Sequence, residues 1–333
     1  MKSQYSIIVP LYNVHDLMKP CVDTLLGQNF IHYELLLIDD GSTDGSADIC
    51  DAYAAKDPRI KAYHRENQGV SAARNFGVSQ AQGEYILFLD ADDYYTDSTM
   101  LEKIDQRLKT SDMVVFGVVG SLNGNLMSDP IPYASLDGLK SEYESGKAFL
   151  EDALTKNPGY MWWPWRYAFK RSVWNDAGAH FPQGVALCED AATVYKAILE
   201  MGKVSVINEP FYAYRQQREG AATNNVTYKK SMDQLNVAVE EISHIAQRSD
   251  ISEKLKRLLC NNFAMGYYAT MIRSTLYPKE ERQKCWQELQ RHKDIAQYRA
   301  TRKQEFAYRL IQCVGIPVTG RILGLRRRLK YGK

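Results

Sequence analysis

The sequence predicts an α/β protein in which a mostly parallel sheet has helices on both faces and is followed by a helical extension. Three observations support this fold class. Short apolar runs alternate with helix-like segments over the first hundred residues, which is the pattern of a parallel sheet. Acidic residues follow two of these runs directly, at the strand ends where open α/β sheets bind ligands. From Lys229 onward, apolar residues recur at helical spacing.

The predicted elements of the first unit follow one another at short intervals. The first strand, residues 5–9, is rich in β-branched residues and ends at Pro10, because proline cannot continue a central strand. In the helix that follows, Leu17, Cys21 and Leu25 share one face. The other predicted elements are strands over residues 35–38, 61–64, 85–89 and 111–119, a helix over 47–55 capped by Ser46 or Asp44, a helix over 71–80, and a helix that begins at Glu189-Asp190.

Length and composition limit the kind of protein. At 333 residues the chain has room for two domains. Its 42 lysines and arginines nearly balance its 40 aspartates and glutamates, so the overall charge gives no support for nucleic acid binding. The six cysteines form no C-x-x-C pair, which is typical of reduced thiols in a cytosol rather than of a disulfide framework or a zinc site. The sequence shows neither a cleavable signal nor an apolar run of about 18 residues, so we expect a cytoplasmic protein that does not cross a membrane.

The clearest chemical signal is the segment 83–93, where an apolar run ends in three aspartates. Alternate residues of an extended chain point the same way, so Asp90 and Asp92 would present two carboxylates to one point at the lip of the sheet. Mg²⁺ and Mn²⁺ prefer oxygen ligands and often keep substrate phosphates in their coordination shell. Two carboxylates therefore suffice for a Mn²⁺ or Mg²⁺ site if a diphosphate supplies the remaining ligands.

The acidic segments have other interpretations. A D-x-D on its own is also compatible with a solvated acidic turn. Residues 40–51 place several oxygen-bearing side chains at EF-hand positions, but the twelfth, Asp51, is not the bidentate glutamate of that loop. A strand followed by D-x-D also opens phosphatases of the haloacid dehalogenase type, although those usually carry it near the start of the chain, and Tyr94 stands where they have threonine or valine. The sequence contains neither a P-loop nor a dinucleotide fingerprint.

Four motifs stand in order within the first hundred residues. They are Val9-Pro10-Leu11-Tyr12-Asn13, Asp39-Asp40-Gly41-Ser42-Thr43-Asp44-Gly45-Ser46, Gly69-Val70-Ser71-Ala72-Ala73-Arg74-Asn75-Phe76-Gly77 and Gly83-Glu84-Tyr85-Ile86-Leu87-Phe88-Leu89-Asp90-Ala91-Asp92-Asp93. Together they resemble family 2 glycosyltransferases of the GT-A fold. The resemblance implies a nucleotide-sugar donor, usually a uridine diphosphate sugar, a divalent metal ion and inversion at the anomeric carbon.

The resemblance also implies which residues contact the nucleotide. Tyr12 would pack on the base, with Pro10 and Asn13 of the same motif also at the donor. Asp40, with Asp39 beside it, would bind the uracil edge and neighbouring groups of the sugar nucleotide. These residue types suit the roles, because an aromatic face stacks on a base and a carboxylate accepts from a ring N–H. The alternative for Tyr12 is an aromatic side chain that anchors its loop.

For the diphosphate, the resemblance implies roles for the third and fourth motifs. Arg74 would serve the diphosphate or orient the acidic site, and the alternative is an ion pair on the face of its helix. Asp90-Ala91-Asp92 matches the D-x-D of the family. These residues would contact the donor, and Asp90 and Asp92 would hold the metal ion, with Asp92 favoured as its direct ligand. A metal ion there would neutralise phosphate oxygens.

The acceptor side is less clearly marked. Trp163 and Trp165 lie in an aromatic cluster, which either belongs to the core or stacks on the apolar face of an acceptor sugar. Glu189-Asp190 matches the E-D motif of the family, which implies Asp190 as the general base and Glu189 as a second candidate on the acceptor side. A carboxylate at a helix start also suits a simple cap. Residues 209–220 resemble a segment that closes over the donor, and the absence of the Q-x-x-R-W of processive synthases favours transfer of a single sugar.

These assignments divide the chain into a GT-A catalytic domain over residues 1–228, a helical extension over 229–318 and a basic amphipathic tail over 319–333. Within the catalytic domain, residues 1–110 would bind the nucleotide-sugar and 111–228 the acceptor. The extension would serve core packing or a homodimer. The tail carries six basic residues and no acid, interleaved with aliphatic ones. It would form either an interfacial helix on an anionic membrane surface or a disordered tail.

The resemblance therefore implies an inverting, metal-dependent transferase. It would move a single sugar from a nucleotide-diphosphate donor, a UDP-hexose or UDP-N-acetylhexosamine, to a hydroxyl of a saccharide or lipid-linked saccharide acceptor in bacterial surface polysaccharide assembly. It would work in the cytoplasm, peripherally on the inner face of the cell membrane. Two alternatives stay open, the D-x-D phosphatase and a sugar-binding module without turnover.

Overall fold

The computed structural model describes residues 4–122, 124–128, 131, 134–216 and 227–331. The chain forms two compact units. The first comprises Met1–Leu150, Met161–Gly184 and Glu189–Gly220, and the second comprises Glu151–Tyr160, Val185–Cys188 and Ala221–Lys333. Residues 151–160 and 185–188, which the sequence analysis grouped with residues 1–228, thus belong to the second unit.

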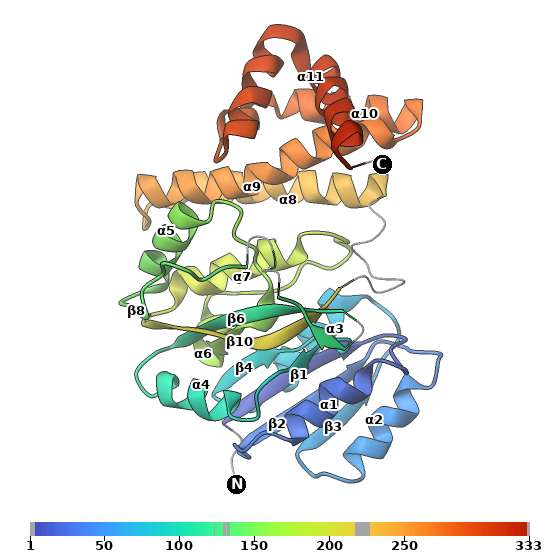
Figure 1. Cartoon of the computed structure of the whole chain (residues 1–333), viewed down its shortest axis with the longest axis vertical. Coiled ribbons are helices and arrows are strands. Elements are labelled where there is room, and N and C mark those ends of the chain that lie inside the picture. The colour runs from blue at the N-terminus through green and yellow to red at the C-terminus, as the bar shows by residue number, and fades with distance from the viewer. Residues whose placement is uncertain (1–3, 123, 129–130, 132–133, 217–226, 332–333) are drawn as a thin grey trace. The chain divides into compact units, whose positions relative to one another are not determined.

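The first unit is built on one sheet with flanking helices (Figure 1). Its elements are, in chain order, β1 (Tyr5–Leu11), α1 (Met18–Leu26), β2 (Tyr33–Asp39), α2 (Ser46–Ala54), β3 (Ile60–His64), α3 (Val70–Gln80), β4 (Tyr85–Phe88), β5 (Tyr94–Tyr95), α4 (Met100–Leu108), β6 (Met113–Leu122), β7 (Asn125–Leu126), β8 (Glu142–Tyr143), α5 (Gly146–Lys156), η1 (Pro164–Arg166), β9 (Tyr167–Lys170), α6 (Arg171–Asp176), α7 (Glu189–Glu200) and β10 (Val204–Arg215). α5 contributes to both units.

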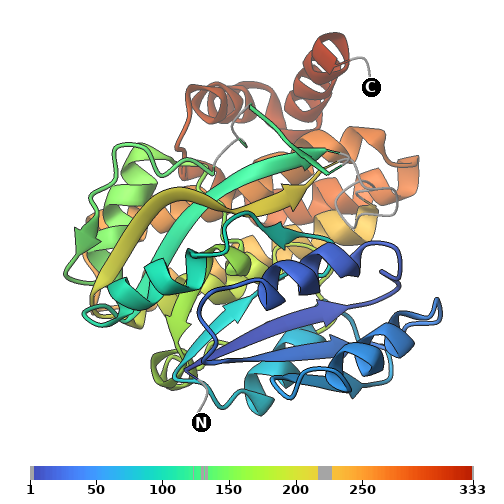
Figure 2. The same cartoon turned by 60° about the horizontal axis from the view of Figure 1, so that its bottom comes forward.

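The strands lie in the order β3-β2-β1-β4-β9-β6-β10-β5, with β7 beside β6 and β8 beside β10. β1 to β4 pair in parallel, and so do β6 and β10. β9 runs antiparallel between β4 and β6. In Figure 2, α1 and α4 lie on the side of the sheet nearest the viewer. The sheet is therefore mixed. The parallel part over β1 to β4 is the one that the alternation predicted, whereas β9 and β10 were not expected from the sequence.

β1 extends two residues further than the sequence predicted. It runs to Leu11, and Pro10 pairs with Ile38 of β2. Pairing with β4 on the other side ends at Ile8, whose C=O accepts the N–H of Leu89 at 3.0 Å. Alternate residues of a strand have the same orientation, so the N–H that Pro10 lacks would face the side where β4 no longer pairs. The missing donor therefore costs no ladder hydrogen bond.

α3 lies close to the parallel strands because its inner face carries small residues. Ala73 and Gly77 are buried, and the helix packs on β1 and β2. A Cβ atom at Gly77 would lie 2.3 Å from Cγ2 of Ile8, so a larger residue would push the helix outward. This close approach brings Arg74, on the same helix, within hydrogen-bond distance of Asp90.

The second unit is helical over its described residues beyond Thr227. Its helices are α8 (Tyr228–Gln247), α9 (Glu253–Arg273), η2 (Ser274–Leu276), α10 (Lys279–Arg291), η3 (Lys293–Gln297) and α11 (Arg302–Tyr331). α8 packs on α9, and α11 contacts both α9 and α10. The Thr227 and Ser252 hydroxyls cap α8 and α9 by accepting the backbone N–H of Lys230 and Leu255, at 3.3 and 3.1 Å.

α11 is interrupted near its middle. Gly315 has a left-handed φ of 73°, two residues before Pro317, and the helix resumes beyond them. The residues from Thr319 to Tyr331 are thus helical, which is one of the two alternatives that the sequence left open for the tail. Within the described ranges, no helix combines the length and the apolar character that crossing a membrane requires.

Candidate active site

The acidic turn Asp90–Asp93 follows the carboxyl end of β4. The N–H of Asp93 donates to the C=O of Asp90 at 2.9 Å, which closes the turn, and the chain then enters β5. Asp90 and Asp92 are partly buried, whereas Asp93 is fully buried. The first two aspartates therefore lie at the lip of the sheet and the third lies beneath it.

Arg74 joins this turn to a second acidic pair at the start of α7. The residue is 3% exposed. Its Nη2 donates to Asp90 Oδ1 at 3.0 Å, and its Nη1 donates to Asp190 Oδ1 at 2.6 Å. Glu189 lies further away, with Oε1 3.9 Å from Nη1. The fold thus brings together side chains from α3, the β4 turn and α7, although Arg74 and Asp190 are 116 positions apart in the sequence.

The surroundings of Asp190 disfavour its charged form. Burial raises the pKa of its carboxyl group well above the ordinary value. The guanidinium of Arg74 opposes this shift, and the carboxylates of Glu189 and Asp90 add to it. A carboxylate whose pKa is raised above its ordinary value binds a proton more tightly than an exposed aspartate does, and here an arginine holds it in place.

Asp93 is a residue of the site that the sequence analysis did not single out. It is 1% exposed. Its Oδ2 accepts the hydroxyl of Tyr212 at 2.6 Å, and its Oδ1 accepts the backbone N–H of Arg215 at 2.7 Å. Burial raises the pKa of Asp93, and the neighbouring Asp92 and Asp90 add to this shift. The only sequence signal was a third acid directly after the D-x-D.

The two partly buried carboxylates of the turn fit a hard divalent cation. Asp90 and Asp92 offer oxygen ligands, while both oxygens of Asp93 are hydrogen-bonded to β10. Among the described residues, no group of three or more His, Cys, Asp or Glu side chains is arranged as a metal site. A Mn²⁺ or Mg²⁺ ion at this turn would therefore take its remaining ligands from phosphate oxygens or water, as Mg²⁺ commonly does beside phosphates.

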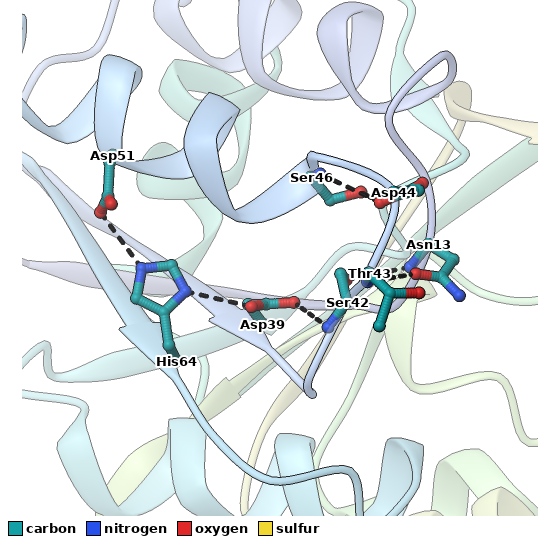
Figure 3. A network of polar contacts seen from close by, with 8 residues as sticks. All are labelled: Asn13, Asp39, Ser42, Thr43, Asp44, Ser46, Asp51 and His64. Carbon is teal, nitrogen blue, oxygen red and sulfur yellow. Dashed lines mark hydrogen bonds and ion pairs between the residues drawn. The ribbon is translucent and has the colours of Figure 1, made fainter.

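A network of polar contacts fixes Asp39 at the end of β2 (Figure 3). Its Oδ1 accepts the N–H of Ser42 at 3.0 Å, and its Oδ2 contacts Nδ1 of His64 at 3.0 Å. Nε2 of His64 contacts Asp51 at 3.1 Å. The histidine thus ties the end of β2 to α2, and the loop between them is held from both sides.

The loop after β1 is joined to the loop after β2. Asn13 has a left-handed φ of 50°, which asparagine tolerates better than most residues. Its N–H donates to Ser42 Oγ at 3.0 Å, and its Oδ1 accepts the N–H of Thr43 at 2.8 Å. Tyr12 is 48% exposed, so its ring is open to stacking by a ligand, whereas Pro10 is buried in β1.

Asp40 holds the start of α3. Its Oδ1 accepts the N–H of Gln68 at 3.1 Å, and its Oδ2 accepts the N–H of Gly69 at 2.7 Å. Gly69, with a φ of 88°, turns the chain into the helix that carries Arg74. The side chain is 3% exposed, so in this structure these contacts chiefly fix the entry to the helix.

The two tryptophans predicted to contact an acceptor differ in exposure. Trp165 is 2% exposed and stacks on Tyr212, with ring centroids 4.1 Å apart and an interplanar angle of 12°. Trp163 is half-buried and stacks on Trp165 at 4.9 Å. A buried indole cannot offer its face to a sugar, so only Trp163 is retained as a candidate acceptor contact.

The segment 209–220 is only partly described. Its residues up to Arg215 complete β10, and residues 217–220 lie outside the described part of the chain. The strand was not expected from the sequence because Pro210 interrupts the apolar run. The pairing of β10 with β6 shifts register on either side of this proline, which is how the strand accommodates it.

Comparisons with known proteins agree with this architecture. The family model described as Glycosyl transferase family 2 matches residues 6–174. Glycosyltransferase GlyG of Streptococcus pneumoniae is 30% identical over 300 residues, which are 84% of this chain and 93% of GlyG.

Two solved structures share the fold. S. aureus TarS 1–349, in complex with UDP-GlcNAc, has a TM-score of 0.74 at 20% identity and is matched over 98% of this chain and 92% of its own. The mannosyltransferase PcManGT from Pyrobaculum calidifontis, in complex with GDP-Man and Mn²⁺, has a TM-score of 0.52 at 16% identity and is matched over 98% of this chain and 88% of its own. The fold is GT-A with a C-terminal helical part.

The contacts of His64 predict a pH-dependent contribution to stability. Hydrogen bonds that the His64 ring donates to Asp39 and Asp51 raise the pKa of His64, so the folded state binds its proton more tightly than the unfolded state does. The resulting stabilisation is fully present below the ordinary histidine pKa of about 6.5 and is lost as pH rises through the folded-state pKa. We therefore expect His64→Ala to lower the melting temperature more at pH 6 than at pH 9.

Thermal unfolding of the wild type and of His64→Ala at pH 6 and at pH 9 measures this difference. His32→Ala is the matched control, because this exposed histidine lies outside the network. An equal loss for His64→Ala at both pH values would show that the imidazole contributes only packing.

Proposed function

Because the chain belongs to the family 2 glycosyltransferases, we propose that it moves a single sugar from a UDP-hexose or UDP-N-acetylhexosamine to a hydroxyl group of a saccharide or lipid-linked saccharide. The transfer would invert the anomeric carbon, use Mn²⁺ or Mg²⁺, and serve bacterial surface polysaccharide assembly. Family membership rests on the matched family model and on GlyG. It makes the chain a glycosyltransferase and sets aside the phosphatase.

The observation that carries this proposal is the bridge from Asp90 through Arg74 to Asp190. A direct displacement at a sugar carbon needs one group that holds the leaving diphosphate and another that accepts the proton of the attacking hydroxyl. One guanidinium thus contacts a candidate for each role, Asp90 through Nη2 and Asp190 through Nη1. This arrangement supports a single site in which both groups act on the same sugar.

For the donor, we assign the nucleotide to the loops after β1 and β2. The exposed ring of Tyr12 would stack on the base, with Pro10 and Asn13 shaping its loop. Asp39 and Asp40 would accept hydrogen bonds from the uracil edge and neighbouring groups. TarS was solved with UDP-GlcNAc, which supports a UDP-sugar as the donor class.

Asp90 and Asp92, with Ala91 between them, would hold the metal ion. When bound, the ion would neutralise charge on the diphosphate. PcManGT was solved with Mn²⁺, which supports a divalent ion in this fold. Arg74 contacts Asp90 and adds a fixed positive charge beside the same turn.

In the transfer step, the acceptor hydroxyl oxygen forms a bond to the anomeric carbon while the bond from that carbon to the diphosphate oxygen breaks. The electron pair of the broken bond stays on the leaving UDP. The carboxylate of Asp190 accepts the hydroxyl proton, and Arg74 keeps that carboxylate oriented. Glu189 and Trp163 would lie on the acceptor side of the same site.

Asp190→Asn should lower the turnover number by about 10²–10⁴, the usual contribution of a positioned general base. The amide cannot take up the proton, which lowers the rate. It has the same shape as the carboxyl group, so binding of UDP in the presence of Mn²⁺ should be preserved. Release of UDP from a UDP-sugar in the presence of an acceptor measures the rate. Near-normal turnover would make Asp190 a helix cap and leave Glu189 as the next candidate.

Asp92→Ala should abolish both transfer and the Mn²⁺-dependent part of UDP binding, while the melting temperature stays close to that of the wild type. The reason is that a carboxylate at the lip of a sheet contributes little to the core. Calorimetric titration of UDP with and without Mn²⁺ makes the test, with Asp176→Ala, at an exposed aspartate of α6, as the control. Retained Mn²⁺-dependent binding in Asp92→Ala would refute the metal assignment.

We also propose that the end of α11 lies on an anionic membrane surface at the inner face of the cell membrane, with the protein otherwise in the cytoplasm. Ile322, Leu325 and Leu329 recur at helical spacing and are exposed. The sequence from Thr319 to the end carries six basic residues and no acid. An exposed apolar stripe beside basic residues suits anionic lipid, where each basic side chain contributes roughly 1 kcal/mol.

Replacing Leu325 and Leu329 together by serine should weaken binding to vesicles that contain anionic lipid, because the apolar contribution is lost while the basic residues remain, and should spare transfer to a soluble acceptor. Vesicle sedimentation makes the measurement. Leu276→Ser is the matched control, because this leucine of η2 is also exposed. Unchanged sedimentation of the double variant would contradict the proposal. Loss of a concentration-dependent dimer instead would mean that a second copy of the chain covers the stripe.

A further inference from the structure

We infer that the hydroxyl group of Tyr212, together with Asp93 and Arg215, positions the acidic turn for metal and diphosphate. No motif in the sequence assigns this role. The inference rests on the metal-dependent transfer proposed above. Tyr212, Asp93 and Arg215 are positioning residues, because they contact the turn from beneath or through its backbone.

The path of the chain explains why the turn needs outside support. β9, β6 and β10 lie between β4 and β5 in the sheet, so the chain leaves β4 near the middle of the sheet and enters β5 at its far edge. A segment that crosses between two such strands has no regular ladder of backbone hydrogen bonds. Its shape therefore depends on the contacts that the crossed strands supply.

β10 supplies those contacts. The hydroxyl of Tyr212 donates to Asp93 Oδ2 at 2.6 Å and accepts the N–H of Asp90 at 3.3 Å. The N–H of Arg215 donates to Asp93 Oδ1 at 2.7 Å, and its Nε donates to the C=O of Asp92 at 2.7 Å. Asp90 and Asp92 are thus held through backbone atoms, which separates these bonds from the carboxylate groups proposed to bind the metal ion.

Tyr212 is itself fixed by the packing around its ring. It is fully buried, and its ring is stacked on Trp165 and meets Tyr95 edge-on at a centroid distance of 6.1 Å. A ring held on two sides cannot swing its hydroxyl away from the turn. The aromatic cluster thereby sets the position of a single oxygen that touches both ends of the acidic turn.

Packing alone would not favour a carboxylate at position 93. Removing a charged group from water is costly unless it is paired and hydrogen-bonded, and an apolar side chain would avoid that cost. Asp93 contacts Tyr212 and Arg215, both on β10, and these bonds fix the shape of the turn. Its burial is therefore explained by positioning rather than by core formation.

The test compares Tyr212→Phe with Tyr95→Phe. Both changes remove one buried hydroxyl and keep the ring, but the Tyr95 hydroxyl has no hydrogen-bond partner among the described residues. We expect Tyr212→Phe to raise the Mn²⁺ concentration for half-maximal UDP release about tenfold, since hydrogen bonds to charged groups are among the stronger ones. Most of the turnover should return at saturating Mn²⁺, and Tyr95→Phe should behave as the wild type.

Amide hydrogen exchange of ligand-free protein over residues 89–95 provides a readout that does not depend on activity. Exchange should be at least tenfold faster in Tyr212→Phe and unchanged in Tyr95→Phe. Arg215→Met, at a half-buried position, should speed the same exchange if Tyr212→Phe proves too unstable to purify.

Unchanged exchange in these variants would overturn the inference, and so would a Mn²⁺ requirement equal to that of Tyr95→Phe. A wild type without Mn²⁺ dependence would instead refute the proposed metal, and the exchange experiment would still decide the positioning role.

Discussion

The arrangement of the site depends on the ion pairs that the buried guanidinium of Arg74 makes. A buried charge is stable only when it is paired, and here carboxylates from two other elements, Asp90 and Asp190, provide the pairing. The same contact keeps those two carboxylates close despite their mutual repulsion. The position of the arginine follows from the fold around α3: Gly77 lets the helix approach β1, and Asp40 holds the turn before it.

Two different kinds of support then shape the two sides of the site. The loops after β1 and β2 are joined by short polar contacts (Figure 3). Tyr12 beside them is exposed, which suits its proposed role of stacking on a base. The acidic turn is instead held from below by one strand and an aromatic stack, through Tyr212 and Trp165. Rigid support of this kind would suit the proposed metal site, because a metal ion needs carboxylates in fixed positions.

The sequence predicted the parts that follow from local pattern. The alternation of apolar runs and helices predicted the parallel strands, and the aspartates after residue 89 were expected at the lip of the sheet. It did not predict β9, because four residues after a tryptophan cluster carry no strand signal. Nor did it pair Arg74 with Asp190, because that contact depends on the path of the chain between them. Asp93 was missed because the sequence does not show which of the three aspartates is buried. The contacts with β10 decide this.

The most direct test of the proposed transfer is to follow the products formed from a UDP-sugar by the purified protein with Mn²⁺ and a saccharide acceptor. We expect one UDP released for each sugar transferred, with no inorganic phosphate and with the product linkage inverted relative to the donor. Release of inorganic phosphate, retention of the donor configuration, or turnover only with GDP- or dTDP-sugars would contradict it.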